Sequence, residues 1–173
     1  MVELTAMRRP FGIALLVTVV ASGCSAGGES AEISFEQSFS GPTQVSVFTA
    51  TGEAIDEGFI CAAATGIFVG NENEEGNALT DAENDAFYAG SERFVAVTVE
   101  EMTCDDGSGE FTFRVYTEID PTDPDYAPDG TTWTITGGRG YEATTGEGAS
   151  SLPEFVGDGV AVWTASGDIT RSE

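Results

Sequence analysis

Short segments that alternate between apolar and polar residues run through most of this 173-residue chain. The clearest is EFTFRVYTEI, residues 110–119, in which Phe111, Phe113 and Val115 alternate with polar side chains. Successive side chains of a β-strand point to opposite faces of the sheet, so this pattern is typical of a strand with one buried face. The valine-rich segment 93–104 precedes it, and the turn DDGSG lies between them. Together they predict an antiparallel β-hairpin.

Six further segments have the composition of short strands and are separated by turn residues. They are residues 33–39, 43–50, 58–70, 131–137, 141–148 and 159–170. Among the other segments, only residues 77–90 have a composition that suits a short helix. The predicted fold class is therefore all-β, with about eight short antiparallel strands in a barrel or a sandwich. We expect a small barrel, because closing the sheet removes its exposed edges.

The N-terminus has the organisation of an export signal. Arg8 and Arg9 precede a short apolar run, residues 11–21, which as a helix cannot cross a hydrocarbon core of about 30 Å. The motif ASGC, residues 21–24, resembles the lipobox of bacterial lipoproteins. This resemblance implies cleavage directly before Cys24 and attachment of fatty acyl chains such as palmitate to its sulfur. Two such chains anchor a protein stably to a membrane, whereas one anchors it only marginally.

These features divide the chain into a signal peptide (1–23), a lipidated tether (24–32) and one acidic domain (33–173). We expect the domain on the outer face of a bacterial cell membrane. An ordinary signal peptide that is cut at another small residue is the alternative. The sequence also leaves open whether translation begins at Met1 or Met7.

The charge of the chain excludes several functions. The formal net charge is −24, all six cationic residues are arginines, and there is no histidine. Such a chain repels nucleic acid and anionic lipid headgroups, so we expect membrane contact through the lipid alone. A Ser-His-Asp triad and a P-loop lysine are both impossible. A hydrated surface that keeps an exported protein soluble, for example in a saline habitat, explains the acidity more simply than calcium binding.

Cys61 and Cys104 are the two cysteines left in the exported domain. In an oxidising compartment a disulfide is the default for such a pair, and a loop of this length contributes about 4 kcal/mol of stability. Two buried free thiols are the alternative. A catalytic thiol would have no histidine to activate it.

The segment GGRGYEATTGEG, residues 137–148, is the most distinctive part of the domain. It contains G-x-G-x-x-A, but no helix-forming sequence follows, which excludes a dinucleotide-binding loop. It is similar to the GGTGxFxxAxG signature of small secreted β-barrels related to the dirigent proteins and allene oxide cyclases. The hairpin at residues 103–113 also resembles theirs. The matching positions are Gly137, Gly138, Gly140, Tyr141, Ala143 and Gly146. This resemblance implies a barrel, but no matching catalytic residues accompany it.

A small eight-stranded barrel can enclose one apolar ligand. The candidates to line such a site are the aromatic residues Phe111, Phe113, Trp133, Tyr141 and Trp163. The alternative is that they form the core. Calcium is the one metal worth considering, because hard oxygen ligands suit it. Its candidate ligands are Asp105, Asp106, Glu110, Asp120, Asp123 and Asp125, which solvated turns explain equally well.

Catalysis is not evident. Glu100 and Glu101 are adjacent on a predicted strand, so they point to opposite faces and cannot act as a pair. The sequence thus predicts a lipid-anchored surface domain with a binding or structural role, without a cofactor other than a possible calcium ion. A barrel that binds a small hydrophobic ligand or is stabilised by calcium, and a barrel enzyme, are the alternatives. The sequence does not identify a ligand or a protein partner.

Overall fold

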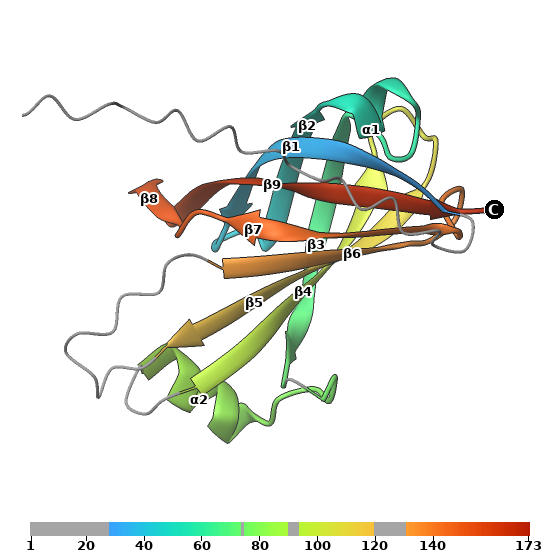
Figure 1. Ribbon diagram of the computed structural model, residues 1–173. Helices are drawn as coiled ribbons and strands as arrows, with labels where there is room; N and C mark the ends of the chain where they lie inside the picture. Colours follow the sequence, from blue (N-terminus) through green and yellow to red (C-terminus); the bar gives the residue numbers. More distant parts are fainter. Residues whose placement is uncertain (1–27, 74, 90–93, 120–130) are drawn as a thin grey trace, which may run out of the picture.

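A β-barrel forms the body of the protein (Figure 1). The computed structural model describes residues 28–73, 75–89, 94–119 and 131–173. Within these ranges nine strands form one antiparallel sheet, and pairing of the first strand with the last closes eight of them into a barrel. The prediction of an all-β fold with a small antiparallel barrel is confirmed.

The strands follow one another around the barrel nearly in chain order, β1-β2-β3-β4-β5-β6-β7-β9, and β8 pairs with the start of β9. Their bounds are β1 Gly28–Ser40, β2 Val45–Thr51, β3 Ala63–Glu72, β4 Phe94–Cys104, β5 Glu110–Ile119, β6 Thr131–Gly137, β7 Thr144–Ser150, β8 Glu154–Gly157 and β9 Val160–Ser172. The two helices in the described ranges are α1 (Glu53–Asp56) and α2 (Asp81–Ala89), and neither is long and apolar enough to cross a membrane.

Strand β1 begins at Gly28, five residues before the predicted start of the domain at residue 33. The expected tether over 24–32 therefore ends earlier than predicted. The physical reason is the length of β9, which pairs with β1 along its whole extent, from Gly28↔Ser172 to Ser40↔Val160. An ion pair between Glu29 and Arg171, 3.0 Å apart, adds to this pairing. Cys24 and the predicted signal peptide lie outside the described residues.

Four aromatic side chains meet at the centre of the barrel. Phe35 packs against Phe48, Phe113 and Trp133, with ring centroids 4.8, 5.6 and 5.0 Å apart. All four rings are almost completely buried. They point inward because alternate residues of each strand face the interior, as the alternating sequence predicted. This aromatic layer separates the two ends of the barrel.

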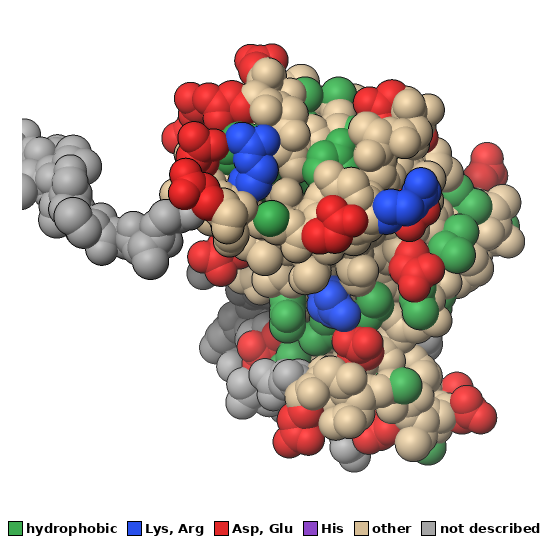
Figure 2. Space-filling view, turned by 90° about the vertical axis from the view of Figure 1, so that its right-hand side faces the viewer, with side chains coloured by type: hydrophobic (Ala, Val, Ile, Leu, Met, Phe, Trp, Pro, Cys, Tyr) green, Lys and Arg blue, Asp and Glu red, His purple; other side chains and the backbone are tan. Residues whose placement is uncertain are grey.

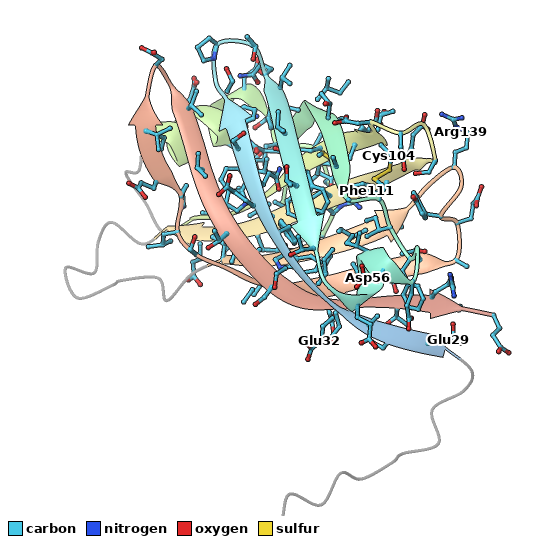
Figure 3. All side chains as sticks on the ribbon, turned by 90° about the horizontal axis from the view of Figure 1, so that it is seen from above. Glu29, Glu32, Asp56, Cys104, Phe111 and Arg139 are labelled. Carbon is cyan, nitrogen blue, oxygen red and sulfur yellow. A yellow bond between two sulfur atoms is a disulfide. The ribbon has the colours of Figure 1, made fainter. Side chains whose placement is uncertain are left out.

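One end of the barrel, here called the disulfide end, is filled by side chains. The predicted disulfide between Cys61 and Cys104 is present there. Phe59 and Ile60, in the loop between α1 and β3, are also buried at this end. Arg171 covers the Phe59 ring, with its guanidinium carbon 4.2 Å from the ring centroid. Figure 3 shows Cys104 and Glu29 at the same end of the barrel, so β1 enters at the disulfide end.

The glycine motif forms the turn between β6 and β7 and the start of β7. A Cβ on Gly137 would overlap the carbonyl oxygen of Tyr141, which excludes any side chain at that position. Gly146 and Gly148 lie against the Trp133 ring, where a Cβ would come within 3.3 and 2.6 Å of ring atoms. The motif therefore allows the turn and makes room for the central indole.

The acidic side chains are spread over the surface. Figure 2, which views the disulfide end, shows them scattered over that face, with the few arginines beside acidic groups. Arg139 pairs with Glu110 at 2.6 Å, and Arg114 lies 3.6 Å from a carboxylate oxygen of Glu72. Such solvent-accessible pairs contribute little stability each. With 30 acidic residues against six arginines, the surface is predominantly anionic.

Candidate functional site

The end of the barrel opposite the disulfide contains a cavity of about 430 Å³. Its walls come from the second halves of β1, β3 and β5, from β4, and from the first residues of β6 and β9, together with β8 and the loop before it. The apolar part consists mainly of Phe39, Phe68, Phe155 and Trp163. The cavity reaches the surface beside β8, since Phe155 lines it with 77% of its own surface exposed. We call this end of the molecule the cavity end.

A buried polar cluster lies between this cavity and the aromatic layer. It consists of Gln37 on β1, Ser46 on β2 and Glu100 on β4, with exposed fractions of 0, 0 and 1%. Gln37 Nε2 donates a hydrogen bond to Glu100 Oε2. Glu100 lines the cavity directly, so a carboxyl group forms part of an otherwise mainly apolar wall.

Burial raises the pKa of Glu100 from its ordinary value of 4.5 to about 7. The cause is loss of hydration of the charged form, which the neighbouring Ser46 hydroxyl and Gln37 amide offset only in part. The Gln37 amide can pair with either form of Glu100, because its nitrogen donates to a carboxylate and its oxygen accepts from a carboxylic acid. Near neutral pH the cavity therefore contains a carboxyl group that readily gains or loses a proton.

Three buried polar atoms lack a hydrogen-bond partner in the described part of the chain: Gln37 Oε1 and Ser46 Oγ in the polar cluster beside Glu100, and Trp163 Nε1 in the cavity wall. Ser46 Oγ is close enough to Glu100 to favour its charged form, but the two do not have hydrogen-bond geometry. Gln37 and Trp163 are directly opposite one another on β1 and β9. A buried polar group without a partner costs about 1–3 kcal/mol. Several such groups close together are therefore typical of a site at which a ligand provides the missing hydrogen bonds.

The structure does not bring the five predicted ligand-binding aromatics together. Trp163 lines the cavity, whereas Phe111, Phe113 and Trp133 belong to the buried core. Tyr141 is part-buried near the disulfide, where its hydroxyl lies 2.7 Å from Ser108 Oγ. The aromatic walls of the cavity come instead from residues that the sequence analysis did not single out.

The predicted calcium ligands in the turn between β4 and β5 each have another partner. Asp105 accepts a hydrogen bond from Thr65, and Glu110 pairs with Arg139, which lowers the pKa of the Glu110 carboxyl. Asp106 accepts from the backbone and side chain of Ser108, which lowers its pKa as well. The other candidates, Asp120, Asp123 and Asp125, lie outside the described residues. Within the described ranges no group of three or more acidic or sulfur-bearing side chains is placed to hold a metal ion.

Glu100 and Glu101 lie on opposite faces of β4, as their adjacency predicted. Glu100 is 1% exposed inside the barrel, and Glu101 is exposed on the outer surface. The sequence contained the signal that marks Glu100: it is two residues from Met102 and four from Cys104, both buried, and so shares their inward face. In a chain with 30 acidic residues, that single inward position was not singled out.

Comparisons of the chain with models of protein families, with curated proteins and with solved structures found no match. The resemblance to the lipobox and to the dirigent-type barrels stays a prediction. The cavity and the buried polar cluster beside it are therefore the features of the described chain that point to a function.

Proposed function

We propose that this protein binds a small, mainly apolar molecule in the cavity of its barrel. The observation that carries this proposal is a cavity of about 430 Å³ with aromatic walls and a few buried polar groups on one side. Ligand sites of about 300–1,000 Å³ commonly combine an apolar lining with a small number of polar groups that fix orientation.

The contrast between the two ends of the barrel supports a binding role over a purely structural one. At the disulfide end, Phe59, Ile60 and Ile169 are at most 2% exposed, and the interior is packed. At the cavity end, Trp163 and Phe155 border open space instead of closing on each other. A barrel that served only as a scaffold would gain stability from a filled interior at both ends.

A fluorescent probe tests the proposal directly. N-phenyl-1-naphthylamine is apolar and uncharged, and its emission rises when it leaves water. We expect saturable binding to the folded protein, accompanied by a change in tryptophan emission that the Trp163→Phe variant loses. Trp163 lines the cavity and Trp133 is 1% exposed in the core, so the two indoles distinguish this site from binding elsewhere.

A pair of variants on one strand provides the control. Ala161 lines the cavity, and Val162 follows it on β9 and points to the other side of the sheet. Ala161→Phe should reduce probe affinity by about tenfold or more by occupying the cavity, whereas Val162→Phe should leave it unchanged. Absence of saturable binding to folded protein, or equal binding by the two variants, would refute the proposal.

We also propose that the domain is held at the outer face of the cell membrane by lipid on Cys24. The support is the ASGC motif at the end of a short apolar segment that follows Arg8 and Arg9. The intact mass of the protein extracted from membranes should correspond to a chain that starts at Cys24 with acyl groups attached. The protein should enter the detergent phase on partitioning, and Cys24→Ser should move it to the aqueous phase. A native N-terminus at another residue would contradict the assignment.

A further inference from the structure

We propose that the ligand is a cationic amine with an apolar body, and that the Glu100 carboxylate is its counter-ion inside the barrel. This inference rests on the proposed function, since it names the class of molecule that the same cavity takes. It follows from the charges, the unsatisfied polar atoms and the aromatic walls of the cavity.

Glu100 is the only ionisable side chain among the described residues that line the cavity. Its neighbours on the adjacent strands are Phe68 on β3 and Phe113 on β5, which carry no charge. The groups that face it from β1 and β2 are Gln37 and Ser46, which are also neutral. The described part of the chain thus provides no cation for this carboxylate. A buried carboxylate without a counter-ion is costly, and a ligand ammonium group is the complement that removes the cost.

The unpartnered atoms of the cluster suit the same ligand. Gln37 Oε1 is a buried acceptor without a donor in the described ranges, and it belongs to the residue that already contacts Glu100. An ammonium group has several N–H donors, so it can pair with both the carboxylate and this carbonyl oxygen. Trp163 Nε1, a buried donor, can pair with an oxygen elsewhere on the ligand.

The walls and the surface charge favour a cation as well. Phe39 and Phe68 lie with their ring centroids 6.1 Å apart beside the cavity, and Trp163 lines it from β9. Aromatic faces attract cations, and they also accommodate the apolar body of the ligand. The net charge of −24 attracts cations toward the protein and repels anions such as fatty acids.

Binding of an amine should release a proton near neutral pH. Free Glu100 has a pKa of about 7, and an ammonium beside it favours its charged form. Below that pH the carboxyl must lose its proton before the ion pair forms, so affinity should increase as pH rises from about 5.5 to about 8. An alkyl amine keeps its own charge throughout this range, because its pKa lies near that of lysine.

A matched ligand series on the full-length protein tests the inference. Octylamine, 1-octanol and octanoate share one chain length and differ in the charge of the head group, and each can be measured by displacement of N-phenyl-1-naphthylamine. We expect octylamine to bind about tenfold more tightly than 1-octanol at about pH 8, and the preference to shrink at about pH 5.5. Octanoate should be the weakest of the three. Calorimetry in two buffers of different ionisation enthalpy should show proton release with octylamine only.

Two variants of neighbouring residues complete the test. Glu100→Gln should keep the binding of the probe and of 1-octanol but lose the preference for octylamine and its pH dependence. Glu101→Gln removes the same charge from the outer face of β4 and should behave as wild type. Equal binding of amine and alcohol, or a preference that persists in Glu100→Gln, would overturn the inference and leave the proposed function standing. Failure of the probe to bind the folded protein would overturn both.

Discussion

Replacement of Glu100 by Gln should stabilise the protein, although it removes one member of a buried hydrogen bond. Glutamine has nearly the same shape as glutamate and can still accept a hydrogen bond from Gln37 Nε2. What it lacks is the negative charge, which burial makes unfavourable. The gain should therefore develop above about pH 4.5, where Glu100 of the unfolded chain is charged and the folded protein must either hold a proton or bury the charge.

The pKa of Glu100 sets the size and the pH range of this effect. The folded-state pKa is about 7, and the unfolded chain has the ordinary value of 4.5. Between these two values the folded protein holds a proton that the unfolded chain has released, so the stability of the wild type falls as pH rises through this range. The loss is then constant above pH 7. At about 1.36 kcal/mol for each pH unit, it amounts to about 3 kcal/mol.

Urea unfolding at a series of pH values measures this contribution. At about pH 5 the variant should be less than about 1 kcal/mol more stable than the wild type, and at about pH 8 it should be about 3 kcal/mol more stable. In a thermal melt this corresponds to a rise in Tm on the order of 10 °C. Other carboxyl groups titrate in both proteins, so the difference between them isolates Glu100.

Glu101→Gln is the control for the general effect of removing a negative charge. With a net charge of −24, removing any negative charge reduces the repulsion within the folded protein. Because Glu101 is exposed, its replacement measures the stabilisation from reduced repulsion alone. Equal stabilisation by the two variants would refute the reasoning. So would a difference between Glu100→Gln and wild type that does not change with pH.

Two further predictions concern the disulfide and the glycine motif. Reduction of the bond between Cys61 and Cys104, or replacement of both by serine, should lower the unfolding free energy by about 4 kcal/mol, measured by urea titration with and without reductant. Gly148→Ala should lower the unfolding free energy by at least about 1–3 kcal/mol, because the new Cβ would lie 2.6 Å from the Trp133 ring. Gly70→Ala, where a Cβ meets nothing within 4 Å, should leave Tm nearly unchanged, and equal effects at the two glycines would contradict this explanation.

Much of the barrel could be predicted from the sequence, because alternation assigns side chains to faces. The hairpin of β4 and β5 has the predicted strands, and its register pairs Thr103 with Glu110 across the turn. The pairing of Cys61 with Cys104 followed from the export signal and the cysteine count. The short strand β8 was missed, since Glu154–Gly157 has neither the length nor the alternation that marks a strand.

The site was harder to predict, because alternation gives the face of a residue but not its level along the barrel axis. Trp133 and Trp163 both point inward, yet Trp133 lies in the packed aromatic layer and Trp163 beside the cavity. Their levels depend on how eight strands are staggered around the closed sheet, which no single strand specifies. For the same reason the approach of Gln37 to Glu100, 63 residues apart in the chain, could not be foreseen.

The direction of β1 determines how the molecule would stand on a membrane. The chain enters the barrel at the disulfide end, and β1 extends from there across the molecule (Figure 1). Its 13 residues span about 40 Å and reach the cavity end. Only three residues separate Cys24 from Gly28. With acyl chains on Cys24, the disulfide end would rest close to the bilayer and the opening would point outward. Such a protein would collect its ligand from the surrounding medium and not from the lipid phase beneath it.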